Sequence, residues 1–219
     1  ADVVLSYLEK NLLGLKTILL THHHLDHVGG VERLVAATGA EVVGAKKDVG
    51  RLPRLERAVE EGEKGCCLGK KYEVLEVCGH TSGHLAYFFA TEKAVFVGDT
   101  LFNHGCGRMF EGTPQEFWAS LKKLRSLPDD TLVYCAHEYT LDNLRFACHF
   151  EPENQMLSER MAFYKGLRQR AAATVPTTMA EQKRTNPFLR CDEKNIMKRV
   201  ASSDPAQVFA RIRSAKDHF

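Results

Sequence analysis

The sequence predicts an α/β domain at residues 1–138 followed by a helical domain at residues 139–219. Between Leu15 and Tyr134, short apolar runs alternate with loops or helical segments, which is typical of a sheet covered by helices. After Glu138, the apolar residues recur with the helical period of about 3.6 residues. In addition, residues that can bind metals follow several of the apolar runs, so a shared site is expected where those strands end.

Six apolar runs are predicted as strands, at residues 15–21, 41–44, 72–77, 85–90, 94–98 and 131–136. Helices are predicted at residues 1–12, 31–37 and 114–127, the last with a capping box formed by Thr113 and Glu116. Residues 46–64 show no clear period and are predicted as loop or short helix. In the second domain, one helix begins near Leu141, a longer one covers residues 157–167, and Asp204 caps the last.

The composition is that of an ordinary globular protein. The 219 residues are 44% hydrophobic and 26% charged, and the net charge of +2 gives no reason to expect a nucleic-acid partner. No apolar run approaches the ~20 residues of a membrane helix, and the first residues lack the pattern of a signal peptide. The seven cysteines form no CxxC pair, which predicts reduced thiols in the cytoplasm, with the mitochondrion as the alternative compartment.

Residues 21–27 read THHHLDH and follow the first predicted strand. Because side chains alternate along an extended segment, His22 and His24 are expected to face one way and His23 the other. Asp26 and His27 fall where the chain turns toward the next helix. Imidazole nitrogen and carboxylate oxygen are ligands of zinc and iron, so one ion is expected at His22 and His24 and a second at Asp26 and His27. A His-rich surface tract is the alternative, but it would require neither the strand before it nor the glycine pair after it.

Three further candidate ligands, His80, Asp99 and His137, each follow an apolar run. Taken alone each is a weak signal, because a histidine after a strand is commonly structural and a Gly-Asp-Thr segment is commonly a turn. Taken together, they predict one rim of loops that carries the site. Two ions that share a carboxylate need about seven protein ligands, and the residues of this rim supply that number with Asp99 as the bridge.

Two other residues near this rim, His84 and Cys106, are not expected to bind a metal. His84 is the remaining histidine expected to contact the site without binding a metal. Cys106 is the thiol that could act as a nucleophile, but a buried structural cysteine is favoured.

The motifs THHHLDH, GHTSGH, GDT and HEYT, in this order, resemble the metallo-β-lactamase superfamily. The segments FVGDTLFNHGCGRMFEG, YCAHEYT, TNPFLR and KDHF are similar to glyoxalase II, the hydroxyacylglutathione hydrolase. This resemblance implies an αββα sandwich with a C-terminal helical domain, and it implies that the first strands of the family's sheet are missing from this chain. The implied ligands are His22, His24 and His80 for the first metal, and Asp26, His27 and His137 for the second, with Asp99 bridging.

The resemblance also implies a substrate and the residues that hold it. The matching positions are Arg108, Phe110, Tyr139, Arg213 and Lys216. Arg213 and Lys216 are three apart on the last predicted helix, so they share a face and suit a glutathione carboxylate; a solvated basic face is the alternative. Two positions depart from the family: Arg108 stands where lysine is common, and Phe110 lacks a hydroxyl that is common there.

The implied reaction is hydrolysis of an S-(2-hydroxyacyl)glutathione, such as S-D-lactoylglutathione, to glutathione and a 2-hydroxy acid. Two divalent ions, zinc first and iron or manganese as alternatives, would activate water, with Asp26 and Asp99 as the catalytic carboxylates. A monomer whose partner is the small thioester is expected, with no membrane or nucleic acid. The alternatives are a glutathione persulfide dioxygenase of the same superfamily, which needs one iron, and a truncated, inactive glyoxalase II isoform.

Overall fold

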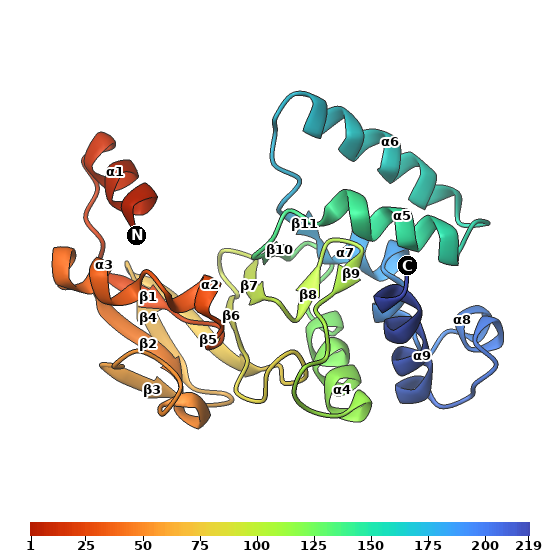
Figure 1. Ribbon diagram of the computed structural model, residues 1–219, viewed down its shortest axis with the longest axis horizontal. Helices are drawn as coiled ribbons and strands as arrows, with labels where there is room; N and C mark the ends of the chain where they lie inside the picture. The colour runs from red at the N-terminus through yellow and green to blue at the C-terminus, as the bar shows by residue number, and fades with distance from the viewer.

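The computed structural model describes residues 1–219 and has four layers, helix, sheet, sheet and helix (Figure 1). The smaller sheet has three parallel strands in the order β1 (Thr17–Leu19), β2 (Glu41–Ala45) and β3 (Arg57–Val59). Helix α3 (Val31–Thr38) covers its outer face through a small cluster that includes Val31 and Val42. The short helix α2 (Leu25–Val28) lies between β1 and α3 in the chain. The α/β architecture predicted from the sequence is confirmed.

The larger sheet has six strands in the order β11-β10-β7-β6-β5-β4. Their bounds are β4 Lys64–Cys67, β5 Lys70–Glu76, β6 Leu85–Phe89, β7 Ala94–Gly98, β10 Leu132–Cys135 and β11 Thr177–Thr178. Because side chains alternate along each strand, Leu85 and Tyr87 of β6 face the smaller sheet whereas Ala86 faces the helices. The two sheets therefore share one apolar layer, and a second apolar layer lies behind the larger sheet.

The second apolar layer is the largest cluster of buried side chains and holds the C-terminal helices against the sheet. Helix α4 (Pro114–Arg125) begins with the predicted capping box, in which the Glu116 amide donates to Thr113 Oγ1 at 3.2 Å. It packs against α9 (Pro205–Asp217), whose first turn is capped by Asp204 as predicted. Phe117 of α4 and Phe209 of α9 are both fully buried, with ring centroids 5.0 Å apart.

The remaining elements of the C-terminal part are helical or very short. Helices α5 (Thr140–Phe150) and α6 (Gln155–Gln169) pack side by side at the upper right of Figure 1. Helix α7 (Met179–Thr185), the 3₁₀ turn η2 (Pro187–Leu189) and helix α8 (Lys194–Arg199) lead to α9. The hairpin of β8 (Leu101–Phe102) and β9 (Gly105–Cys106) follows β7.

One segment differs from the sequence predictions, and one predicted helix forms without burying any of its side chains. Residues 46–64, predicted as loop or short helix, contain the 3₁₀ turn η1 (Lys46–Asp48) but also β3 and the start of β4. These strands lack apolar alternation because β3 is a short edge strand and because Gly65 of β4 leaves room for the Tyr72 ring, which a Cβ would meet at 2.2 Å. Helix α1 (Asp2–Lys10) forms as predicted but buries none of its residues, and it stands apart in Figure 1.

Substitution of Phe209 measures how much the packing of α9 contributes to the stability of the fold. We expect Phe209→Ala to lower the free energy of unfolding by about 3–5 kcal/mol, because the cavity cannot be refilled between the Phe117 and Phe188 rings. Urea unfolding measures this value. The control is Phe163→Ala on α6, at a half-exposed ring, which should cost less than ~1 kcal/mol; equal losses for the two variants would contradict the assignment of α9 to the core.

Candidate metal centre

The first histidine triad, His22, His24 and His80, is assembled from two loops at the ends of β1 and β5. The Nδ1 atom of His24 lies 3.1 Å from Nε2 of His22 and 3.1 Å from Nε2 of His80. A neutral imidazole donates from only one of its nitrogens, so three converging nitrogens cannot satisfy one another by hydrogen bonds alone. A cation placed among them would accept all three lone pairs, and the donor set therefore fits a divalent metal ion.

The second group, Asp26, His27 and His137, lies beside the first. Helix α2 presents Asp26 and His27, and the loop after β10 presents His137, whose Nε2 lies 3.4 Å from Asp26 Oδ2. Asp26 is the most exposed of the candidate ligands, with 61% of its side chain accessible. Its carboxylate therefore faces solvent at the mouth of the site, where a water molecule can reach it.

Asp99 lies between the two groups. Its carboxylate is 3.3 Å from Nε2 of His27, 3.6 Å from Nε2 of His80 and 3.4 Å from Nε2 of His137. Although burial opposes ionisation, the close contact with His27 and its positive charge hold the pKa of Asp99 below its usual value, so the carboxylate stays charged. His27 Nε2 and Asp99 Oδ1 are buried without a hydrogen-bond partner, which further fits these residues to a bound cation.

Neighbouring groups fix the orientation of the ring nitrogens. The Thr21 hydroxyl lies 3.1 Å from Nδ1 of His22, and the Arg108 carbonyl accepts from Nδ1 of His80 at 2.8 Å. These contacts leave the Nε2 atoms of both rings free to face the site. Burial lowers the pKa of His80 and of His24, which keeps both rings neutral as metal binding requires.

His84 contacts the centre without joining either group, as the sequence predicted. It is fully buried, stacks on His22 at 4.6 Å, and its Nε2 accepts from the Asp99 amide at 3.2 Å. The turn that carries Asp99 also depends on Gly98, which has a φ of +49° and whose Cβ would lie 2.6 Å from Thr21 Oγ1. Asp99 is thus held by its backbone as well as by its side chain.

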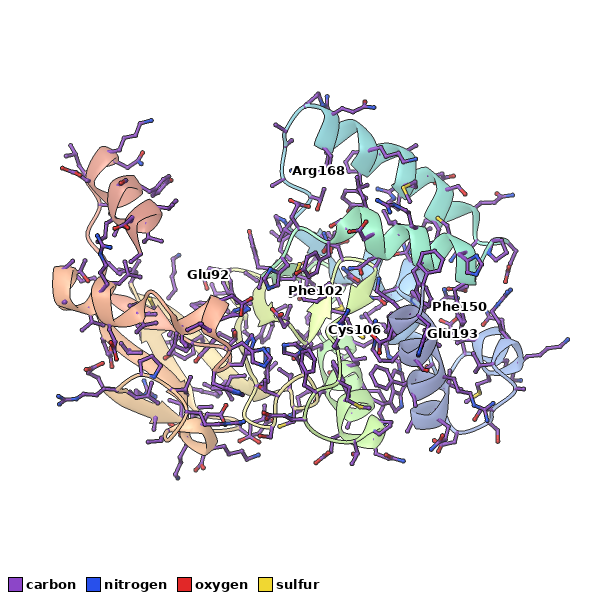
Figure 2. The ribbon with its side chains drawn as sticks, in the orientation of Figure 1. Glu92, Phe102, Cys106, Phe150, Arg168 and Glu193 are labelled. Carbon is purple, nitrogen blue, oxygen red and sulfur yellow. The ribbon has the colours of Figure 1, made fainter.

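A cavity of about 400 Å³ opens next to the centre, in the middle of the molecule where Figure 2 labels Phe102 and Cys106, two of its lining residues. His80 and Asp99 form the wall shared with the metal centre. The structure brings all five predicted substrate residues to this cavity: Arg108, Phe110, Tyr139, Arg213 and Lys216. Sequence reasoning missed Asp142, Asn143 and Asp217 in the same lining, because single polar residues on a helix carry no motif.

The two cations of α9 differ in their surroundings. Arg213 is buried, donates to the Cys106 carbonyl at 2.9 Å and pairs with Asp217 at 3.0 Å, so its guanidinium already holds β9 and α9 together. Lys216 instead lies over the Phe146 ring at 5.4 Å. Burial and the neighbouring Arg213 charge lower the pKa of Lys216 to about 8. Lys216 is therefore the cation of the pair that has most to gain from an anionic ligand.

Comparison with known proteins assigns the family. Residues 1–137 match the family model of the metallo-beta-lactamase superfamily, and residues 138–219 match that of the hydroxyacylglutathione hydrolase C-terminus. The hydroxyacylglutathione hydrolases of Rhodospirillum rubrum and a Synechococcus species are 45% and 48% identical to the chain. All of this chain is aligned in both comparisons, over 86% and 88% of the relatives' lengths. The chain belongs to the hydroxyacylglutathione hydrolase (glyoxalase II) family.

The fold of this glyoxalase II family member is also found in solved structures. The protein TTHA1623, crystallised in a di-iron-bound form, superposes with a TM-score of 0.62 at 28% identity, over 85% of this chain and 84% of that one. The metallo-β-lactamase fold implied by the sequence is thereby confirmed. Together with the His and Asp clusters, the fold supports two divalent metal ions. None of its helices is both long and apolar enough to cross a membrane.

The burial of neutral His84 predicts a pH dependence of stability. Burial lowers the pKa of His84 to about 3, so an unfolded chain takes up a proton that the folded chain refuses. The free energy of unfolding is at its full value above the unfolded pKa of about 6.5, and it decreases as pH falls toward 3. At pH 5 the decrease due to His84 is about 2 kcal/mol. Urea unfolding of the metal-free protein at pH 7.5 and 5 should show this loss.

The His84→Gln variant keeps a hydrogen-bond acceptor but cannot titrate, so its stability should fall less between the two pH values. The control is His218→Gln, at an exposed ring near the end of α9, which should leave the pH dependence of the wild-type protein unchanged. An identical pH dependence in the wild-type protein and His84→Gln would contradict the role given to His84.

Proposed function

We propose that this protein is a binuclear metal-dependent thioesterase that hydrolyses S-(2-hydroxyacyl)glutathione, such as S-D-lactoylglutathione, to glutathione and a 2-hydroxy acid. The observation that carries the proposal is the shared wall of the cavity. His80 and Asp99 belong both to the metal centre and to the cavity that Arg108, Tyr139 and Lys216 line. The curated relatives named hydroxyacylglutathione hydrolase support the same activity. We further propose a monomer that acts in the cytoplasm, with the mitochondrion as the alternative compartment.

The two ions would be held by the residues that the structure groups. The first would bind His22, His24 and His80, and the second Asp26, His27 and His137, with Asp99 between them. Zinc is our first choice, and the di-iron form of TTHA1623 supports iron as the alternative, with manganese third. When bound, such ions polarise a carbonyl oxygen and make water a better nucleophile near neutral pH.

The chain's own residues orient the reactants. The exposed Asp26 carboxylate accepts a hydrogen bond from the attacking water and directs it toward the cavity. The Phe110 ring lies 5.7 Å from His24 and 5.3 Å from His80, and it excludes solvent from one side of the thioester. As the carbon–oxygen bond forms and the carbon–sulfur bond breaks, the glutathione sulfur leaves on the side of the cavity.

The peptide part of the substrate is held by cations and aromatic rings. Lys216 and Arg108 supply positive charge for the glutathione carboxylates, and the Tyr139 hydroxyl supplies a hydrogen-bond donor. The Tyr139 ring stacks on His137 at 4.9 Å, which fixes its direction. Arg213 acts mainly through the carbonyl of Cys106, keeping the β9 side of the cavity in place.

Substitution of Asp99 tests the metal part of the proposal. We expect about two metal ions per chain in the wild-type protein, and loss of both metal and thioester hydrolysis in Asp99→Asn, because the amide removes the charge that both ions would share. Mass-spectrometric metal analysis and the decrease of thioester absorbance measure the two effects. Asp129→Asn, at an exposed carboxylate that pairs with Lys183, is the control. Two tightly bound ions without turnover in the wild-type protein would contradict the thioesterase assignment.

Substitution of Lys216 tests whether its positive charge binds the substrate. Because its pKa is about 8, the free enzyme loses this charge as pH rises past that value, and kcat/KM for S-D-lactoylglutathione should fall about tenfold by pH 9. In Lys216→Arg the guanidinium stays charged, so the fall should be much smaller over the same range. Initial rates between pH 7 and 9 measure both profiles. Superimposable profiles would show that Lys216 does not bind the substrate.

A further inference from the structure

A buried carboxylate outside the metal centre connects the loops that surround it. Asp48 ends η1 and is only 1% exposed. Its Oδ1 accepts from Nη2 of Arg51 at 2.6 Å, and its Oδ2 lies 3.3 Å from Nδ1 of His23. A buried carboxylate is costly unless it is paired, and these two contacts supply the pairing. Asp48 is therefore tied to the residue between His22 and His24 in the chain.

Arg51 extends the connection to a second carboxylate group. Its Nη1 donates to Oε1 of Glu111 at 2.6 Å, and its Nη2 donates to the Ser82 hydroxyl at 2.8 Å. Oε2 of Glu111 accepts from both the amide and the hydroxyl of Ser82, each at 2.8 Å. We call Asp48, Arg51 and Glu111 the charged bridge. Its two shortest contacts, from the Arg51 guanidinium to Asp48 and to Glu111, are both 2.6 Å and charge-assisted.

The charged bridge meets three loops that carry the site. His23 belongs to the first ligand segment, Ser82 lies between His80 and His84, and Glu111 directly follows Phe110. The fit is close, because a Cβ at Gly83 would lie 2.3 Å from the Asp48 carboxylate carbon. The loop of residues 80–84 thus rests directly on the buried end of the bridge.

The segment of residues 107–111 is attached to the loop of residues 80–84 at two points. The first is the Arg108 carbonyl, which accepts from His80 Nδ1 at 2.8 Å. The second is the Glu111 carboxylate, held by Arg51 and Ser82. Although burial opposes it, the hydrogen bonds from Arg51 and Ser82 hold the pKa of Glu111 at about 2, so the second attachment persists at neutral pH. Arg108 and Phe110 lie between these two points.

We propose that Asp48, Arg51 and Glu111 are positioning residues that hold residues 107–111 against the first histidine triad and so favour glutathione thioesters over thioesters of smaller thiols. None of the three lines the cavity, so they act through Arg108 and Phe110 and not by touching the substrate. The inference rests on the proposed thioesterase function. It adds a reason for the substrate preference that lies outside the cavity itself.

The test compares two substrates in Glu111→Gln, which keeps the side-chain size and removes the charge. S-D-lactoylglutathione reports on the whole cavity, whereas the lactoyl thioester of N-acetylcysteamine lacks the glutamyl and glycyl parts and reports on the metal centre. We expect kcat/KM to fall about tenfold for the glutathione thioester and less than about twofold for the smaller one. Calorimetry should show glutathione itself binding about tenfold more weakly, with unchanged metal content.

Two further variants test whether the residues act as a unit. Arg51→Met should give the same selective loss as Glu111→Gln, and the double variant should be no worse than either single variant. Ser82→Ala removes one anchor of Glu111 without changing any charge, and should give a smaller loss of the same kind. It keeps the proposal testable should Glu111→Gln fold poorly.

The matched control is an ion pair of similar geometry outside the metal centre and the cavity lining. Arg125 pairs with both oxygens of Asp192 at 2.6 Å. Asp192→Asn should leave kcat/KM for both substrates unchanged. A wild-type protein inactive on the glutathione thioester would refute the proposed function. An active wild-type protein whose Glu111→Gln variant loses both substrates equally, or loses neither, would overturn the positioning role alone.

Discussion

The metal centre depends on nitrogen and oxygen atoms that are held close together but cannot all form hydrogen bonds with one another. Nδ1 of His24 faces two other ring nitrogens at 3.1 Å, and Asp99 Oδ1 is buried beside His27 without a hydrogen bond. Isolated loops would relax such an arrangement by turning the side chains toward water. Here the loops leave strands that pack against apolar clusters of both sheets, and the stability of those clusters maintains the arrangement.

Much of this site could be predicted from the sequence, because each ligand follows a strand and the strands were recognisable from their apolar runs. His80, Asp99 and His137 are far apart in the chain, yet their positions after predicted strands were enough to place them on one rim. The helix caps at Thr113 and Asp204 could also be predicted, since capping depends only on neighbouring residues. The family resemblance supplied what local patterns could not, namely the proposed substrate residues, all of which line the cavity.

What escaped prediction is governed by contacts between distant segments. Strand β3 carries no alternation that could reveal it, because it is short and lies at the edge of its sheet. Asp48, Arg51 and Glu111 looked like ordinary charges in a sequence where charged residues are common. Their pairing depends on how η1 packs beneath the loop of residues 80–84, which no local pattern specifies. The two cations of α9 were expected to act alike, whereas Arg213 is engaged by the Cys106 carbonyl and Asp217.

The largest apolar cluster also determines how the molecule can move. It joins Val95 and Val97 of the sheet to Met179, Phe188 and Ile212 of the C-terminal part, with no break between the two. Segments that share one close-packed core do not swing on a hinge, because rotation would open voids along their whole boundary. A ligand therefore enters and leaves the cavity through movements of side chains and loops at the rim. Such movements occur on the nanosecond-to-microsecond timescale.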